Sequence, residues 1–303
     1  MIEFKPFQLE DKALYDTYLF CCGERGCEYS FANLYLWGRQ QAAIENDRML
    51  FFSQYNRRSV YLFPIGPGDL KTAVDAIICD ASQRGIPCRL TGLLQEDCQQ
   101  LQLLYPDRFR FHFDRDSFDY VYAIDDLAEL KGRKFQKKRN HLNRFRQAHP
   151  EHRLVEITEE NIGTVEAFVE LWYQTPLEEN PYGDYQMEQV AIRKALRNRD
   201  SLGLEGLMLL DGDTPLAMAL GSLLSEDTFD IHFEKALDIA DGAYAAINQG
   251  FAAYLWKKYP QLLWLNREDD MGLEGLRKAK LSYCPDHMIE KHWSCLLEDC
   301  YDY

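Results

Sequence analysis

Hydrophobic runs and helical patterns alternate through the first third of the chain. Two strand-like runs flank a polar turn and predict a hairpin, and a third run leads to Asp69, a typical helix N-cap. Apolar residues then recur at helical spacing, before a short strand and a second helix. These elements are expected at residues 41–44, 49–53, 59–63, 69–81, 88–90 and 93–104.

The same order of elements recurs later in the chain. The turn Asp211-Gly212-Asp213 joins two apolar runs as a hairpin, and another strand and helix follow. The expected elements are strands at 204–210, 215–224 and 228–235, a helix at 243–259, a strand at 262–266 and a helix at 273–281.

Strands that alternate with helices indicate a mixed, partly parallel sheet with helices on its faces. The order found twice here is that of a GNAT-type acyltransferase fold, so we expect a tandem GNAT-like α/β protein with two mixed sheets flanked by helices. A length of 303 residues fits two domains. We place an N-terminal scaffold domain at 1–124 and a C-terminal, candidate catalytic domain at 125–303.

The composition indicates the class of protein and its cellular compartment. Hydrophobic residues make up 46% of the chain, but no apolar run approaches the roughly 20 residues that span a bilayer. The N-terminus lacks the features of a signal peptide, which favours a cytoplasmic protein. The nine cysteines include a loose group of Cys21, Cys22 and Cys27 without a matching second pair of ligands. We therefore expect reduced thiols and no metal site.

The net charge of −15 disfavours indiscriminate nucleic-acid binding, yet one segment is strongly basic. Residues 131–146 contain eight cations and no acid, with Phe135, Leu142 and Phe145 on one stripe of a predicted helix. A solvated surface helix explains this pattern, and so does a phosphate-binding face. If this face binds phosphate, the residues that contact the phosphate groups of the donor are Lys137, Lys138, Arg139 and Asn143.

The strand at 228–235 carries a row of titratable groups. Alternation places Asp230, His232 and Glu234 on one face and apolar residues on the other. A histidine and a carboxylate two residues apart can orient or deprotonate an attacking amine or hydroxyl. A strand with one face in solvent would show the same pattern.

Small residues follow at 238–248, where a helix is expected to begin. Backbone N–H groups at a helix N-terminus favour an anion, and a plain Asp cap would look similar. The segment contributes Gly242, Ala243, Tyr244 and Asn248 as candidate donor-binding residues. It lacks the glycine-rich loop with which ordinary GNAT enzymes hold coenzyme A.

A charged cluster ends the strand at 262–266. Ligands of open α/β sheets bind at such carboxyl ends, which makes Arg267 and Asp269 candidates. Lys280 falls on the face of the following helix that should be buried. It must either extend its amine to solvent or pair with an acid or a phosphate.

Four ordered blocks resemble the C-terminal domain family of bacterial phosphatidylglycerol lysyltransferases. They are 137–145, 232–236, 242–248 and 266–283, the last including Asn266-Arg267-Glu268-Asp269-Asp270-Met271-Gly272 and Lys280-Leu281-Ser282-Tyr283. The resemblance implies a tandem GNAT fold and, in characterised members, transfer of an aminoacyl group from tRNA to a lipid or other acceptor. Those lysyltransferases carry a multi-helix membrane domain that this sequence does not contain.

Acyl transfer needs an activated donor, a deprotonated acceptor and a stabilised oxyanion. Our hypothesis is that Glu234, assisted by His232, orients or deprotonates the acceptor. Arg267 and Lys280, positioned by Asp269, neutralise the donor phosphate or the developing charge. The donor is acyl-CoA or aminoacyl-tRNA as a co-substrate, with no tightly bound cofactor and possible tRNA binding. The acceptor is a small molecule or a lipid headgroup. The alternative is a non-catalytic GNAT-like protein that binds an anion or phosphate or has a regulatory role.

Overall fold

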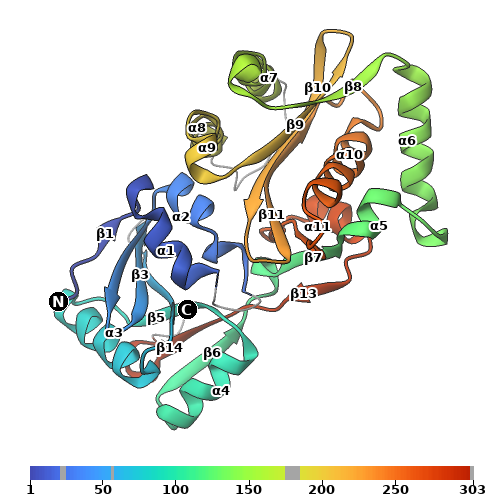
Figure 1. Cartoon of the computed structure of the whole chain (residues 1–303). Helices are drawn as coiled ribbons and strands as arrows, with labels where there is room; N and C mark the ends of the chain where they lie inside the picture. Colours follow the sequence, from blue (N-terminus) through green and yellow to red (C-terminus); the bar gives the residue numbers. More distant parts are fainter. Residues whose placement is uncertain (21–24, 56–57, 175–184, 301–303) are drawn as a thin grey trace. The chain divides into compact units, whose positions relative to one another are not determined.

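The computed structural model describes residues 1–20, 25–55, 58–174 and 185–300 (Figure 1). The chain divides into two compact units. The first comprises Met1–Asp119, Asp269–Glu274 and Met288–Tyr303, and the second comprises Tyr120–Glu268 and Gly275–His287. This division differs from the expected 1–124 and 125–303, because the end of the chain belongs to the first unit.

The first unit contains a seven-stranded mixed sheet in the order β1-β2-β3-β4-β5-β14-β6. Strands β4 and β5 are parallel. Parallel neighbours require a crossover, and α3 (Leu70–Arg84) provides it, with the Asp69 carboxylate capping the helix by accepting from the N–H of Thr72. The strands are β1 (Lys5–Pro6), β2 (Gln40–Glu45), β3 (Arg48–Tyr55), β4 (Arg58–Ile65), β5 (Arg89–Leu93), β6 (Phe109–Phe113) and β14 (His292–Leu296).

The last strand of the chain completes this first sheet. Strand β14 lies antiparallel to both β5 and β6, so Ser294 pairs with Leu90 on one side and with Phe111 on the other. Its Cys295 forms a disulfide with Cys300, contrary to the reduced thiols expected from the sequence. Cys21 and Cys22 lie outside the described residues. The other helices of the unit are α1 (Lys12–Leu19), α2 (Phe31–Trp37) and α4 (Gln95–Leu104).

The second sheet repeats the strand order of the first, as β8-β9-β10-β11-β12-β7-β13. Here β11 and β12 are the parallel neighbours, and α10 (Ala243–Lys258) crosses between them. The predicted fold class, a tandem GNAT-like α/β protein with two mixed sheets flanked by helices, is confirmed. The strands are β7 (Asp119–Ala123), β8 (His152–Glu156), β9 (Glu205–Asp211), β10 (Thr214–Leu223), β11 (Thr228–Ala236), β12 (Trp264–Asn266) and β13 (His287–Ile289).

Helices cover the second sheet. Helix α10 packs on β9, β10 and β11, and α7 packs on β10 (Figure 1). The basic helix α6 lies against α10 and is anchored by Phe135, Leu142 and Phe145, the apolar stripe predicted from the sequence, which is buried. Each such buried side chain contributes about 1.5–3 kcal/mol. The helices are α5 (Ile124–Glu129), α6 (Gln136–Ala148), α7 (Ile162–Gln174), α8 (Tyr185–Arg197), α9 (Arg199–Leu202) and α11 (Glu274–Leu281).

Among the described helices, none combines the length and the apolar character needed to cross a membrane.

Candidate functional site

A largely buried ion pair joins β11 to the segment after β12 in the second unit. Glu234 comes from β11, Asn248 from α10, and Arg267 directly follows β12. Arg267 donates from Nη2 to Glu234 Oε1 over 2.8 Å, and Asn248 donates from Nδ2 to Glu234 Oε2 over 3.0 Å. Both carboxylate oxygens of Glu234 are thereby engaged. The sequence interpretation of Glu234 as a group that orients or deprotonates the acceptor did not include these two partners.

Arg267 is enclosed by aromatic rings. Its guanidinium carbon lies 5.5 Å from the ring centroid of Tyr122 and 5.0 Å from that of Tyr283. Burial alone would lower the pKa of Arg267, but Glu234 outweighs burial and raises it. Arg267 Nη1 and Asn248 Oδ1 are buried without a hydrogen-bond partner among the described residues. Buried polar groups are rarely left in this state, so the two atoms mark a place where a ligand would complete the hydrogen bonding.

The second unit has a pocket of about 270 Å³, and Tyr283, which contacts Arg267, forms part of its wall. Lys138 and His141 of α6, the loop at 237–242, Tyr244 and Ala245 of α10, and Tyr283 line it. The Nζ atom of Lys138 lies 3.6 Å from the ring centroid of Tyr283. Burial, together with the nearby charge of Arg267, lowers the pKa of Lys138 to about 8. The pocket therefore contains a lysine that is partly neutral near physiological pH.

Gly242 allows α10 to begin against α6. Its φ is +90°, a backbone conformation that L side chains rarely adopt, and a Cβ there would lie 2.6 Å from the carbonyl oxygen of His141. Ala243 and Ala245 are buried, and Ala245 and Tyr244 also line the pocket. Close packing of the two helices thus accounts for the small residues at this helix start.

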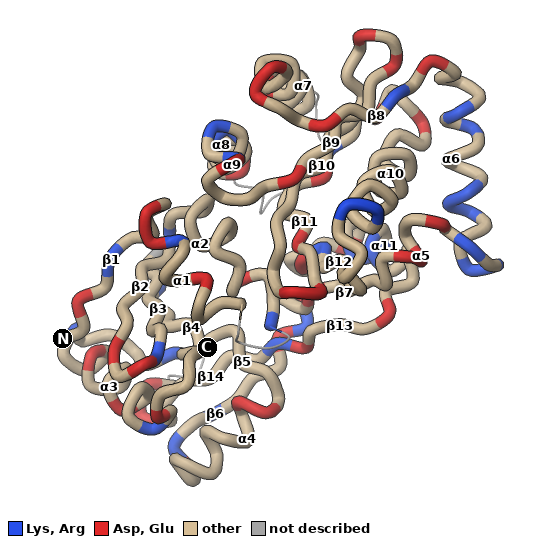
Figure 2. Tube along the Cα trace, in the orientation of Figure 1, with Lys and Arg blue, Asp and Glu red and all other residues tan. Residues whose placement is uncertain are grey.

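Part of the positive charge of the basic segment, residues 131–146, is paired with acidic side chains. Figure 2 shows Lys and Arg along α6, but acids outside the segment pair with part of it. Lys131 pairs with Glu129 over 2.6 Å, Lys134 with Asp126 over 2.6 Å, and Arg144 with Asp241 over 3.4 Å.

The candidate phosphate-binding residues of α6 differ in accessibility. Arg139 donates through Nη1 to the backbone oxygens of Leu130 and Gly132 and so holds the end of α5. Lys138 is half-buried and faces the pocket. Lys137 and Asn143 are exposed. Of the four, Lys137 is the cation that solvent and a large ligand can reach most easily.

His232 belongs to a separate network within the second unit. Its Nε2 lies 2.8 Å from Ser222 Oγ, and its Nδ1 lies 3.3 Å from Asp230 Oδ2 and 3.4 Å from Glu268 Oε1. Burial alone would lower the pKa of His232, but the two carboxylates outweigh it and raise the pKa to about 9. His232 is therefore a buried cation at neutral pH, with partners other than Glu234. Ser222 was not predicted, although it pairs in register with Asp230 across the hairpin.

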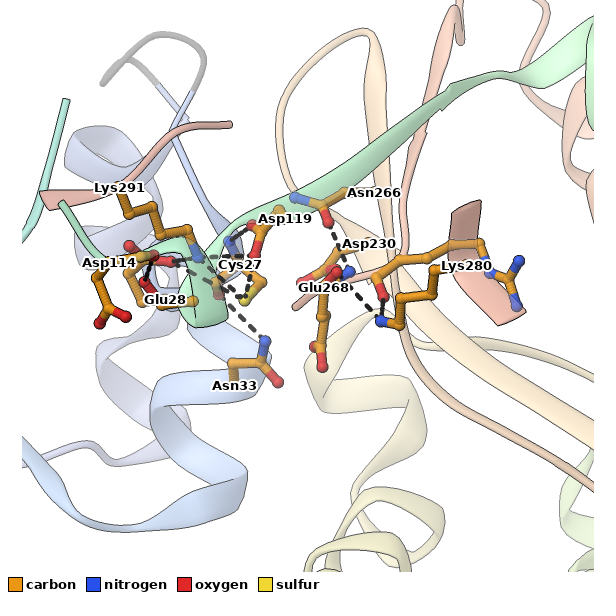
Figure 3. Close-up of polar contacts among 12 residues, drawn as sticks. Cys27, Glu28, Asn33, Asp114, Asp119, Asp230, Asn266, Glu268, Lys280 and Lys291 are labelled. Carbon is orange, nitrogen blue, oxygen red and sulfur yellow. Dashed lines mark hydrogen bonds and ion pairs between the residues drawn. The ribbon is translucent and has the colours of Figure 1, made fainter. Parts of the chain in front are cut away.

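Lys280 binds the backbone of the loop after β12, and Asp269 belongs to the first unit. Lys280 Nζ donates to the backbone oxygens of Arg267 and, over 3.1 Å, of Glu268, so the buried ammonium fixes the loop after β12 (Figure 3). The Lys280 side chain is buried and does not extend to solvent. Asp269 belongs to the first unit, where its charge helps to raise the pKa of Lys291.

The first unit also has a buried charged cluster. Lys291 Nζ donates to Glu28 over 2.5 Å and to Asp119 over 2.7 Å, and Cys27 Sγ lies 3.8 Å from Nζ (Figure 3). Burial lowers the pKa of Lys291, but Asp119, Cys27 and Glu28 outweigh it and raise the pKa well above its ordinary value. The sequence did not predict this cluster, because Asp119 and Lys291 are far apart in the chain.

Two groups of side chains could offer ligands to a metal ion: Cys27, Glu28 and Asp119, and Asp230, His232 and Glu268. In each group a positive charge is already present. The Lys291 ammonium pairs with carboxylates of the first group, and protonated His232 lies next to the carboxylates of the second. With a neighbouring cation in each group, we assign neither group to a metal.

Comparison with known proteins finds a matching family and several similar structures. The family model described as phosphatidylglycerol lysyltransferase, C-terminal, matches residues 21–295. A conserved protein of unknown function from Bacteroides thetaiotaomicron is 36% identical, with a TM-score of 0.92, over 98% of this chain and 100% of that chain. The L-PGS structure from Bacillus licheniformis is 16% identical, with a TM-score of 0.69, over 97% and 93% of the two chains.

A curated relative also matches, the uncharacterized protein MYCGA3080 of Mycoplasmoides gallisepticum. It is 28% identical over 182 residues, which are 58% of this chain and 55% of that protein. The chain therefore spans about half the length of the curated relative that it matches.

Proposed function

The chain belongs to the phosphatidylglycerol lysyltransferase C-terminal family, and on this premise we propose that it transfers an acyl or aminoacyl group to an amine or hydroxyl acceptor. The observation that carries the proposal is the buried Nη1 of Arg267, which has no partner among the described residues. Tyr283, whose ring lies 5.0 Å from the guanidinium of Arg267, also lines a pocket. A guanidinium held in place before the reaction is suited to an oxyanion that develops during acyl transfer.

The proposed roles follow from the contacts. Glu234 and Asn248 orient Arg267, which stabilises the oxyanion formed when the acceptor attacks the acyl carbon. Lys138, in its neutral form, accepts the proton that the acceptor loses. The new bond joins the acceptor nitrogen or oxygen to the acyl carbon, and the bond to the donor oxygen or sulfur breaks. The proton then passes from Lys138 to the leaving group.

For the donor we propose aminoacyl-tRNA rather than acyl-CoA. Packing against α6 accounts for Gly242, so this helix start offers no independent support for a coenzyme A pyrophosphate. Exposed cations such as Lys137 remain available on α6, and a polynucleotide backbone binds such a face through phosphate contacts. The acceptor in this proposal is a small molecule or a lipid headgroup that carries an amine or hydroxyl.

The test is a binding and transfer assay on the full chain with charged tRNA and, separately, with acetyl-CoA. We expect a salt-sensitive tRNA complex that Lys137→Glu weakens several-fold. Lys257→Glu is the matched control, because Lys257 is also exposed but lies on α10. Transfer from acetyl-CoA without tRNA binding would overturn the donor assignment. Binding without transfer to any amine or hydroxyl acceptor would favour the non-catalytic, anion-binding alternative.

A further inference from the structure

The first unit, which the sequence marks as a scaffold, has a pocket of its own. Its volume is about 480 Å³, within the usual range for small-molecule sites. The side chains of Arg25, Arg48 and Asp97 bring charge to it, and Phe63, Ile65 and Pro67 provide an apolar wall. All of these residues belong to the first unit.

The two arginines of this pocket are held differently. Arg25 forms a two-pronged ion pair with Asp97, with both N–O distances at 2.8 Å, and its guanidinium stacks near Tyr29 and Phe63. These two charges therefore neutralise each other. Arg48 donates from Nε to the carbonyl oxygen of Gly68 over 2.7 Å and from Nη1 to that of Pro64 over 2.9 Å.

Arg48 is consequently a half-buried cation whose direct partners are neutral. Among the described residues, no carboxylate oxygen lies within 4.0 Å of the Arg48 nitrogens. The Nη2 atom of Arg48 donates no hydrogen bond to any described residue. Burial lowers the pKa of Arg48, and the charge of Arg25 lowers it further, although Asp69 and Asp97 act in the opposite direction. A partly desolvated cation is costly without a counter-ion, so an anion in the pocket would be favourable.

The glycines of the adjoining loop have a packing role rather than a ligand-binding one. A Cβ at Gly68 would lie 1.9 Å from the carbonyl oxygen of Asn46, and one at Gly66 would lie 2.5 Å from that of Asp47. The loop therefore packs against the β2–β3 turn, and the carbonyl groups that hold Arg48 come from Gly68 of the loop and Pro64 at the end of β4. The N-terminus of α3 is already capped by Asp69. Arg48 is therefore the cation of this pocket whose direct partners leave its charge uncompensated.

We propose that the first unit binds a small organic oxyanion, a carboxylate or a phosphate ester, against Arg48, with its apolar part on the wall at Phe63 and Ile65. The fixed guanidinium offers Nη2 to the anionic oxygen, and charge-assisted bonds of this kind are among the strong ones. This site is separate from the Arg267 pocket of the second unit and does not depend on the proposed transfer reaction.

The experiment measures thermal unfolding of the full chain with sodium pyrophosphate or sodium citrate, against sodium chloride at equal ionic strength. We expect at least one probe to raise the melting temperature by about 5 °C at saturating concentration. Arg48→Gln should abolish the increase, and Arg58→Gln, an exposed arginine on β4, should retain it. A response to pyrophosphate alone assigns phosphate esters, and a response to citrate alone assigns carboxylates.

Two further measurements keep the result interpretable if Arg48→Gln fails to fold. Arg48→Lys retains the charge and should retain part of the increase, and in the wild-type chain the methyl signals of Ile65 should shift with the active probe. Arg267→Gln should leave binding in the first unit unchanged, which separates this proposal from the transferase proposal. No increase with either probe would overturn the inference. An increase that Arg58→Gln removes as completely as Arg48→Gln would also overturn it.

Discussion

Arg267 uses one arm of its guanidinium to hold Glu234 at 2.8 Å and keeps the other arm buried without a partner among the described residues. The rings of Tyr122 and Tyr283 lie against the group. The ion pair therefore leaves Nη1 in a defined position, where it can serve a ligand. This arrangement leads to the first prediction.

Arg267→Gln should lower kcat about 10²–10³-fold, the loss typical of removing one oxyanion donor. KM for the donor should change much less, because the interaction strengthens only as the oxyanion forms. Initial rates with whichever donor supports transfer provide the measurement. Lys278→Gln, an exposed lysine on α11, is the matched control and should keep full activity. An unchanged kcat in Arg267→Gln would contradict the assignment.

The second prediction concerns the pH dependence of the rate. Because burial lowers the pKa of Lys138 to about 8, its neutral amine forms as the pH rises through that value. If the neutral form accepts the proton, kcat should increase from pH 7 to pH 9 and then level off. Lys138→Arg keeps the charge but cannot titrate, so its rate should be low and independent of pH over this interval.

Lys137→Arg is the control for this profile, since Lys137 is exposed on the same helix. It should retain the wild-type rise. A rate that still rises through pH 8 in Lys138→Arg would refute the role of Lys138 as proton acceptor. A donor affinity that falls over the same interval, with kcat constant, would instead make Lys138 an anion contact.

The elements of the fold were largely predictable, because they depend on local patterns. The N-cap Asp69, the hairpin turn at 211–213 and the strand that carries His232 all occur as expected. The placement of β14 in the first sheet was not predictable. Its partners on β5 and β6 lie far away in sequence, and a five-residue strand does not specify a distant partner.

The sequence identified several residues of the candidate site, but it did not predict which of them contact one another. Glu234 and Arg267 were both identified, but their pairing depends on β11 and β12 lying side by side. Alternation on β11 placed His232 and Glu234 on one face, yet their partners come from other segments. Ser222 and Glu268 engage His232, and the register that brings them there is a property of the whole sheet.

His232 gives the third prediction, on stability. Its pKa is about 9 in the folded chain, above its ordinary value of 6.5, so the folded state binds the proton more tightly than the unfolded state. The resulting stabilisation is complete below pH 6.5 and is lost as the pH rises through 9. The loss should be on the order of 2–3 kcal/mol. Urea unfolding at pH 6 and pH 9 measures it.

His232→Gln supplies the reference for this measurement, because other groups also titrate in the interval. The free energy of unfolding of the wild-type chain should exceed that of His232→Gln, and this difference should be larger at pH 6 than at pH 9. A difference that stays constant would mean that His232 is not protonated in the folded chain at pH 6. The nitrogen chemical shifts of the imidazole provide a direct second measurement.

Gly242 gives the last prediction, which tests how the pocket is built. Ala at this position would adopt an unfavourable φ of +90° and would press on the backbone of His141, which belongs to α6. Gly242→Ala should therefore destabilise the chain by about 1–3 kcal/mol and shift α6 away from α10. Gly163→Ala on α7 is the matched control, because a Cβ there meets no atom within 4 Å and alanine favours a helix. The control should be neutral or slightly stabilising. A Gly242→Ala chain as stable as the wild type would mean that α6 yields easily, and Lys138 would then lack the fixed position that its proposed role requires.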